Sequence, residues 1–547
     1  MKDRVVNLRK RGIARCITVC TAIVLIAVII GLILKCYLIN TAPEKNYIIS
    51  THYFANEWPK NFWNAEWDTI DQDFEQIRND GFNTIIVVVP WREFQPEISP
   101  IKYNESVWDR IPLLLEKAAK HNLDVQIRAG YLHDFMGDYN SSDRFYQIIW
   151  DKNARIAWCD YMGRLYGICS EYENFTGGFI TWEDFWHNYR LGEYLAEHEE
   201  ERLEYARRDL FGEFLSGKYT LEEFNAEYGV NYADFDDIPI PCGEDRYKKE
   251  WYECVDVITM EILEETRDVF PDLFMEVRTD DDLMPENEKY SHDITWDCRG
   301  GKMTGIMYQI GQGLEVKREQ LTAEIAVQML ENWLQKIYDK NGQIPIYMEQ
   351  FLFYDNTPGN KNGDIILNID QENYFVNCVP IFKKYTNGYG VWIYRDYCNN
   401  LLYNPQFFFG LDGWDAGERV SFDANSGSNR AYLDNDSICQ YIPDWRMPAS
   451  TGERYTFSMD YDASQDTIFT VRIGSQLKVI KVSGKGKLEF QVNEESDMSI
   501  SVFCDGQAYV DNLKLYNLVS TQLMYGVDNS EKMYIENIRI MNRLMTE

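Results

Sequence analysis

The stretch WDTIDQDFEQIRNDGFNTIIVVVPW, residues 67–91, decides the fold that we expect. Its first part carries apolar residues at helical spacing and ends at Gly81, which is typical of a surface helix. Its second part, residues 83–91, contains a continuous apolar run bounded by Pro90. Such runs are typical of strands that are buried on both faces of a parallel sheet. The stretch therefore predicts one repeating unit of an α/β fold.

The same alternation repeats from residue 47 to residue 397. Strands are predicted at residues 47–54, 83–91, 123–134, 175–184, 272–280, 304–311, 343–353 and 388–397. Helices fill most of the gaps, although the gap after the fifth strand has no clear helix. Eight such units predict a closed (β/α)8 TIM barrel, which we place at residues 44–400. An open doubly wound sheet is disfavoured, because no glycine-rich phosphate loop follows the first strand.

The pattern changes near residue 400, where short alternating strands are separated by turn residues. Examples are RYTFSMDYDAS (454–464) and AYVDNLKLYN (508–517). This pattern predicts an all-β sandwich of jelly-roll type over residues 403–517. Residues 518–547 are polar with one short predicted helix, and the sequence assigns no role to this tail.

The N-terminus carries six basic residues before an unbroken apolar run at residues 16–34. This run is long enough to cross a hydrocarbon core of roughly 30 Å as a helix. The basic flank predicts that residues 1–40 form a cytoplasmic segment and a transmembrane signal anchor. The rest of a single-pass cell-membrane protein then lies outside the cytoplasm. A cleaved signal peptide is the alternative, but the run is long for one and no small-residue cleavage site follows it.

The composition restricts the class of partner. The chain of 547 residues has a formal net charge of -34, which argues against nucleic acid because a polyanion is repelled. Apolar residues make up 45% of the chain and aromatic residues 15%, enough for large cores. Acidic, aromatic-rich surfaces suit neutral polar ligands such as sugars. The cysteines show no zinc-ligand spacing.

Two carboxyl groups mark the expected active site, because such barrels place it at the carboxyl ends of their strands. Glu183 follows the fourth strand in FITWED (179–184), and Glu349 lies in the seventh strand, IPIYMEQFLF (344–353). A solvated strand-end acid is the plain explanation for Glu183. An acid inside an apolar strand, however, costs several kcal/mol unless it is paired or functional. Cleavage of a glycosidic bond needs such a pair, one to protonate the leaving oxygen and one to attack or to activate water.

Polar and aromatic residues accompany these acids at the strand ends and just beyond them. Aromatic rings offer flat apolar faces to sugar C–H groups, and an arginine keeps a nearby carboxylate ionised. We therefore predict substrate contacts from His52, Trp91, Arg128, Tyr131, Trp182, His187, Arg278, Tyr308 and Trp392.

The order of these parts resembles clan A, the retaining glycoside hydrolases with (β/α)8 barrels. Residues 67–97 resemble the clan's early segment, and SGKYTLEEFNAEYGVNYADFDDIPIP (216–241) is similar to an insertion in the family 42 β-galactosidases. The resemblance implies that Glu183 is the acid/base and Glu349 the nucleophile, about 5–5.5 Å apart. It also implies that Trp392 forms the floor of the sugar subsite.

These features predict a membrane-anchored, extracytoplasmic glycoside hydrolase that cleaves a poly- or oligosaccharide with retention of configuration. One departure favours another class of protein. The clan has Asn immediately before its acid/base, whereas this chain has Trp182. The alternatives are therefore a non-catalytic glycan-binding surface protein on an inactive barrel and a scaffold in surface-polysaccharide assembly.

The C-terminal sandwich resembles the carbohydrate-binding modules of families 4 and 9. The resemblance lies in NPQFFFGLDGW (404–414) and AYVDNLKLY (508–516). It implies a structural calcium with Asp511 as a candidate ligand, and a spacer without any ligand is the alternative. No cofactor is expected for catalysis.

Overall fold

The computed structural model describes residues 47–547 apart from residues 66, 132–141, 279–281, 297–302, 311–319, 354–364, 367–369, 425–428, 443–453, 494–497 and 520–523. The predicted anchor at residues 16–34 lies outside the described part. Within the described part, no helix is both long enough and apolar enough to cross a membrane.

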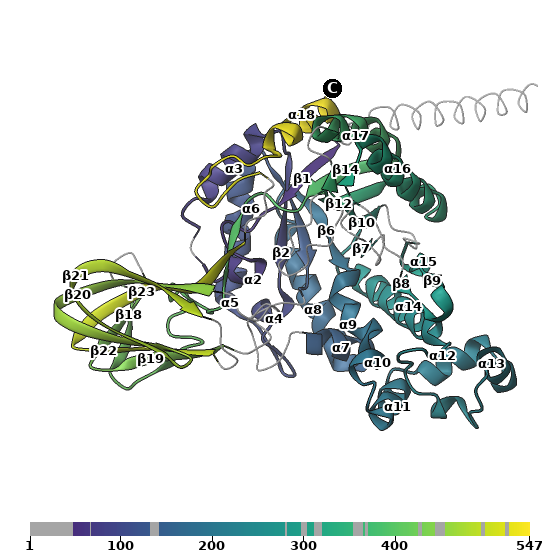
Figure 1. Ribbon diagram of the computed structural model, residues 1–547, viewed down its shortest axis with the longest axis horizontal. Helices are drawn as coiled ribbons and strands as arrows, with labels where there is room; N and C mark the ends of the chain where they lie inside the picture. Colours follow the sequence, from purple (N-terminus) through teal and green to yellow (C-terminus); the bar gives the residue numbers. More distant parts are fainter. Residues whose placement is uncertain are drawn as a thin grey trace, which may run out of the picture. The chain divides into compact units, whose positions relative to one another are not determined.

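The predicted barrel is confirmed. Eight parallel strands close on themselves in chain order, and the last pairs with the first (Figure 1). They are β1 (Ile48–His52), β2 (Thr84–Val89), β5 (Asp124–Ala129), β6 (Phe175–Thr181), β7 (Phe274–Arg278), β10 (Thr304–Gln309), β12 (Ile346–Leu352) and β14 (Thr386–Val391).

Amphipathic helices cover the outside of this barrel. They include α3 (Ile70–Asn79), α6 (Arg110–Lys120), α8 (Lys152–Cys169), α14 (Lys248–Arg267), α16 (Ala323–Lys340) and α17 (Gln371–Tyr385). In α6 the buried residues Ile111, Leu114, Leu115 and Ala118 recur at helical spacing, so one stripe of the helix packs on the strands. The described part of the gap between β7 and β10 holds only short elements, as expected: β8 (Asp282–Leu283), a 3-10 helix (Pro285–Asn287), β9 (Lys289–Tyr290) and α15 (Asp293–Trp296).

A helical insertion follows β6. It runs through α9 (Trp186–Tyr189), α10 (Leu191–Tyr194), α11 (Glu199–Arg208), α12 (Phe211–Lys218) and α13 (Leu221–Tyr228) before α14 returns to the barrel. Thr220 and Glu223 form a capping box that starts α13, and Gly229, at φ 68°, ends it.

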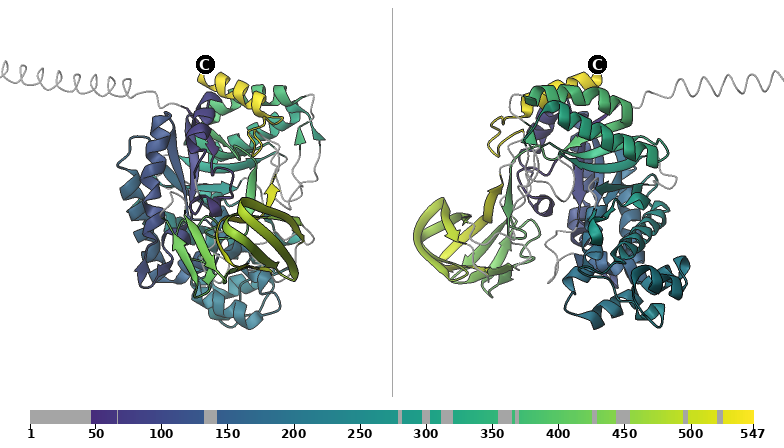
Figure 2. Two further views of the ribbon diagram at one scale, coloured as in Figure 1. Left: turned by 90° about the vertical axis from the view of Figure 1, so that its left-hand side faces the viewer. Right: turned by 45° about the vertical axis from the view of Figure 1, so that its right-hand side comes forward.

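The expected all-β domain is confirmed as a nine-stranded antiparallel sheet, while its jelly-roll type stays a prediction (Figure 2). Its strands are β15 (Tyr397–Asn400), β16 (Asp415–Ala416), β17 (Val420–Asp423), β18 (Arg430–Asp434), β19 (Ser437–Ile442), β20 (Arg454–Ile473), β21 (Gln476–Asn493), β22 (Met498–Asp505) and β23 (Gln507–Val519). The register of β20 against β21 shifts between Ala463 and Thr467. Before the shift β20 pairs with β23, and after it with β22, so β20 joins both halves of the domain.

The C-terminal tail ends in the helix α18 (Ile535–Thr546), as predicted. This helix packs against α17 on the outside of the barrel (Figure 1). It buries Ile535, Ile538, Met541 and Met545, which recur at helical spacing.

Candidate active site

Glu349 lies in β12, completely buried. Its Oε2 lies 2.7 Å from Nε2 of His52 in β1. Because β14 lies between β1 and β12 in the sheet, this contact crosses the barrel interior. Two residues earlier on the same strands, Ser50 Oγ lies 2.6 Å from Tyr347 Oη. The alternation of strand residues thus stacks the His52–Glu349 pair on a second polar layer inside the barrel.

Burial sets the protonation of this pair. It raises the pKa of Glu349 to about 8; Arg128 opposes the rise and the negative charge of Glu183 adds to it. Burial also lowers the pKa of His52 to about 3, and Arg128 acts in the same direction. At neutral pH His52 is therefore uncharged and Glu349 keeps a proton. Oε1 of Glu349 has no hydrogen-bond partner among the described residues.

Arg128, near the end of β5, holds the second acid. Its Nη2 donates to Glu183 Oε2 at 2.9 Å and lies 3.9 Å from Asp184 Oδ1. Burial alone would lower the pKa of Arg128, but the charges of Asp184, Glu183 and other acids raise it above its ordinary value. The Glu183 side chain is 39% exposed, whereas those of Arg128 and Asp184 are buried. A short 3-10 helix, residues 182–185, turns Glu183 toward Arg128.

The two pairs form one cluster, because the charges of Arg128 and Glu183 both act on Glu349 and on His52. Four of the predicted site residues thus meet at the carboxyl ends of β1, β5, β6 and β12. Sequence reasoning missed a further buried acid, Glu276 in β7, whose charge also acts on Arg128.

Three aromatic rings adjoin the cluster. Trp392 follows β14 and meets His52 edge-on, with ring centroids 4.9 Å apart. Trp58 lies 5.9 Å from Trp392 and 6.4 Å from Tyr131. Arg128 lies 5.2 Å from the centre of the Tyr131 ring. Sequence reasoning also missed Trp58, which is only partly buried and lies six residues after the end of β1.

Trp182 is packed into a buried cluster. Its ring lies 4.7 Å from His292 and 5.0 Å from Tyr189. Behind them, Asp256 of α14 accepts a hydrogen bond from Tyr189 Oη at 2.7 Å and lies 3.0 Å from His292 Nδ1. This packing anchors the turn that carries Glu183. A sugar contact by Trp182 remains a prediction.

The structure does not bring the other predicted residues into the cluster. The Trp91 indole is buried, donates to Gln95 Oε1 at 2.8 Å and packs on Trp158. Tyr308 is buried and stacks on Phe351, whose ring also meets Tyr374 of α17, so it faces the helix layer.

Two further residues were predicted to contact substrate, His187 and Arg278. His187 lies between Tyr146 and Tyr194, with ring centroids 6.2 and 5.6 Å away, and burial lowers its pKa. Arg278 ends β7, and its side chain lies outside the description.

Over the described ranges, no group of three or more His, Cys, Asp or Glu side chains is placed to hold a metal ion. Asp511 lies in β23, where its Oδ1 accepts the backbone N–H of Asn512 at 2.7 Å. Because calcium takes six to eight oxygen ligands, these residues do not make a fitted site, and the calcium stays a prediction.

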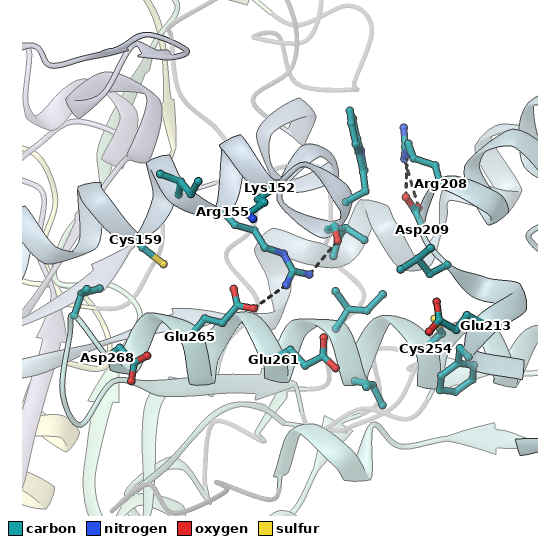
Figure 3. A pocket seen from close by; sticks show the side chains of 18 residues that line it. Lys152, Arg155, Cys159, Arg208, Asp209, Glu213, Cys254, Glu261, Glu265 and Asp268 are labelled. Carbon is teal, nitrogen blue, oxygen red and sulfur yellow. Dashed lines mark hydrogen bonds and ion pairs between the residues drawn. The ribbon is translucent and has the colours of Figure 1, made fainter. Parts of the chain in front are cut away.

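A groove of about 1040 Å³ lies on the helix layer, between α7 (Ser142–Trp150), α8, α12 and α14 (Figure 3). The partly exposed side chains of Trp150, Ile156 and Leu210 line it, together with an ion pair of 3.0 Å between Arg155 and Glu265. No predicted site residue lines this groove, so it is separate from the cluster around Glu349.

No family model and no curated protein matches the chain, but solved structures do. A catalytic mutant of a GH42 β-galactosidase from G. stearothermophilus is 12% identical, with a TM-score of 0.46, over 64% of this chain and 52% of that chain. A β-galactosidase from the psychrophilic Marinomonas ef1 is 12% identical, with a TM-score of 0.43, over 64% and 54%. A GH5_18 protein from Streptomyces cattleya in complex with GlcNAc is 13% identical, with a TM-score of 0.40, over 64% and 71%. The match thus spans about half the length of both β-galactosidases.

Proposed function

We propose that this chain is a glycoside hydrolase whose catalytic carboxyl groups are Glu349 and Glu183. The state of Glu349 carries the proposal. Glu349 is fully buried, and one of its carboxyl oxygens lies 2.7 Å from His52. Its other oxygen has no hydrogen-bond partner in the described part. The charge of a second carboxyl group, Glu183, acts on it. A buried acid in this state costs stability, and strongly perturbed acids with a specific charge partner cluster at functional sites.

We propose that the two carboxyl groups hold one proton between them at neutral pH. Arg128 favours the charged form of Glu183, and burial favours the neutral form of Glu349. Interacting acids of this kind titrate as a pair. One proton and one negative charge are what the cleavage of a glycosidic bond needs from its two carboxyl groups.

In the retaining reaction that we propose, the proton passes from Glu349 to Glu183 when the substrate binds, so the charge of the pair is unchanged. Glu183 then protonates the glycosidic oxygen, the Glu349 carboxylate bonds to the anomeric carbon, and the C–O bond to the leaving group breaks. Water attacks this glycosyl-enzyme, Glu183 takes the water proton, and Glu349 leaves as a carboxylate. Two displacements retain the configuration of the sugar.

We further propose a poly- or oligosaccharide substrate. The three rings beside the cluster support it: Trp58, which is partly buried, and Tyr131 and Trp392, which are buried. The anchor at residues 16–34 supports a place in the cell membrane, with the N-terminus cytoplasmic and the barrel outside. The all-β domain is proposed to bind glycan, with or without calcium at Asp511.

A glycan-binding protein on an inactive barrel is the second candidate. One observation favours it: the residue before Glu183 is Trp182, an indole packed on Tyr189 and His292, which offers no side-chain amide to a sugar hydroxyl. A scaffold in polysaccharide assembly predicts neither cleavage nor glycan binding.

The test uses the fragment from Pro43 onward against a panel of polysaccharides and unactivated glycosides. We expect release of reducing sugar, with retention of configuration in the first product seen by NMR. Inversion would overturn the retaining reaction. Silence across the panel, with glycan retained on an affinity gel, would favour the binding protein. Silence without retention would favour the scaffold.

The pH dependence gives a sharper prediction. We expect kcat/KM for an unactivated glycoside to fall as the pH rises through about 8, because the pair then loses the proton that the leaving oxygen needs. A glycoside with a strongly acidic phenol as leaving group is the matched control, because it leaves without protonation. A kcat/KM that rises through pH 8 for the unactivated glycoside would contradict the shared proton.

A further inference from the structure

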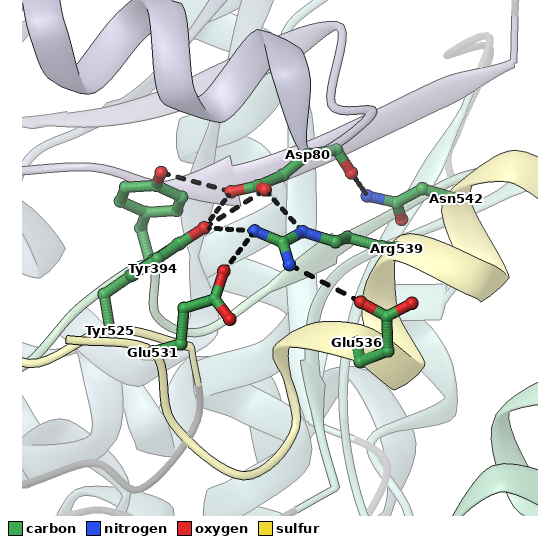
Figure 4. A network of polar contacts seen from close by, with 7 residues as sticks. All are labelled: Asp80, Tyr394, Tyr525, Glu531, Glu536, Arg539 and Asn542. Carbon is green, nitrogen blue, oxygen red and sulfur yellow. Dashed lines mark hydrogen bonds and ion pairs between the residues drawn. The ribbon is translucent and has the colours of Figure 1, made fainter. Parts of the chain in front are cut away.

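The C-terminal tail reaches back to a buried carboxylate near the beginning of the barrel. Asp80 follows α3 and is almost fully buried. It accepts hydrogen bonds from Arg539 Nε of α18 at 2.8 Å and from Tyr525 Oη at 2.9 Å (Figure 4). Asn542 Nδ2 donates to the Asp80 backbone oxygen at 2.9 Å. Three residues of the tail thus converge on one residue of the barrel.

Asp80 also holds the segment that carries Trp392. Tyr394 Oη donates to Asp80 Oδ2 at 3.2 Å, and the Tyr394 backbone N–H donates to the His52 carbonyl at 3.3 Å. One residue further on, Arg395 Nη2 lies 2.7 Å from Asp73 Oδ1 in α3. The chain from residue 392 to residue 396 is therefore fastened to α3, and α3 is fastened to the tail.

A second set of contacts joins the tail to the same segment directly. The backbone N–H of Asp396 donates to the Tyr525 carbonyl at 2.8 Å, and Lys532 Nζ lies 3.2 Å from Asp396 Oδ2. Arg539 Nη2 donates to Tyr525 Oη at 2.9 Å and to Glu531 at 2.7 Å, so Arg539 also stabilises the tail through contacts within it. Arg539 supplies the positive charge that faces Asp80.

We infer that the tail, residues 524–547, positions Trp392 at the candidate active site through Asp80 and Tyr394. Arg539 and Tyr525 are positioning residues, because neither touches the cluster around Glu349 in the described contacts. Burial already raises the pKa of Asp80, and Arg539 is the charge that opposes this rise. Without Arg539, Asp80 has to take up a proton or move, and either change weakens the hydrogen bond that it accepts from Tyr394. The inference rests on the proposed function only for its activity readout.

The test compares Arg539→Met with Arg543→Met, because Arg543 is an exposed arginine four residues further along α18. Hydrogen exchange is followed in peptides that cover residues 388–400 and in peptides from β20 to β23. In Arg539→Met we expect the amides of residues 392–397 to exchange at least about tenfold faster, with the all-β domain unchanged. Arg543→Met should match the parent. Where the parent cleaves a glycoside, kcat/KM should fall about 10- to 100-fold, because small misplacements of positioning groups have effects of this size.

The outcomes separate the two proposals. Faster exchange in Arg539→Met, together with a parent protein that cleaves no glycoside, would support the positioning role and count against the hydrolase. Unchanged exchange and activity in a folded Arg539→Met variant would overturn the positioning role and leave the hydrolase intact. If Arg539→Met does not fold, Tyr525→Phe removes only one hydroxyl, and Arg539→Lys keeps the charge. Exchange that is faster in Tyr525→Phe and restored in Arg539→Lys supports the inference, and parent-like exchange in Tyr525→Phe overturns it.

Discussion

The Glu349→Gln variant is expected to lose glycoside cleavage and to gain about 3–5 kcal/mol of stability near pH 9. The folded chain holds the Glu349 proton up to about pH 8, whereas the unfolded chain releases it near the ordinary value of 4.5. Between these values the unfolded state binds fewer protons, so the free energy of unfolding of the parent falls as the pH rises. Glutamine resembles the protonated acid and has no proton to lose, so the free energy of unfolding of the variant does not fall in this way.

Urea unfolding of parent and variant at several pH values measures the effect. The difference should be small near pH 4, grow between pH 4.5 and about 8, and stay level above it. Glu97→Gln is the matched control, because Glu97 is half-exposed and pairs with Lys102 on the surface. A Glu349→Gln variant that is less stable than the parent at pH 9 would show that Glu349 is ionised and favourably paired in the folded chain.

The second large effect is expected from Arg128→Met. Arg128 is a buried cation beside Glu183, Asp184 and Glu276, of which the last two are buried. Removing one partner of a buried ion pair leaves uncompensated charge and costs about 3–5 kcal/mol. We therefore expect a loss of that size in the free energy of unfolding, and no glycoside cleavage.

Chemical denaturation at pH 7 checks this expectation. The matched control is Arg207→Met, which removes an arginine whose ion pair with Asp237 is half-exposed and should cost less than about 1 kcal/mol. Equal losses in the two variants would mean that the acids around Arg128 are protonated, and would remove the ionised Glu183 from the proposed reaction.

The sequence predicted the barrel because each strand is a short buried run between amphipathic helices. It also placed Glu183 and Glu349 at the same end, since that follows from parallel strands. Their partners were harder to assign. The position of a residue in its strand shows at which end of the barrel it lies. The alternation of side chains along the strand decides whether it faces the barrel interior. Tyr308 shows the difference: Gly305 pairs with the interior residue Glu276, so Met307 faces inward and Tyr308 faces the helices.

Glu276 was missed for the opposite reason. It lies inside β7, FMEVR (274–278), and not at its end, although it is a single acid in an apolar strand like Glu349. The same signal could have found it. Trp58 carried no local signal beyond its place after β1, because its neighbours Tyr131 and Trp392 are distant in sequence. Contacts of this kind depend on barrel closure, which a local pattern does not specify.

The contact between Asp80 and Arg539 joins residues 459 positions apart. On a chain made or exported from its N-terminus, α3 emerges long before its counter-charge. The interface between α3 and the segment after β14 therefore cannot reach its final state until α18 has appeared, and contacts at such separations form late. A chain cut short before residue 539 should leave α3 loosely held and open to proteases. The state of α3 therefore depends on whether α18 has been made and has docked against the barrel.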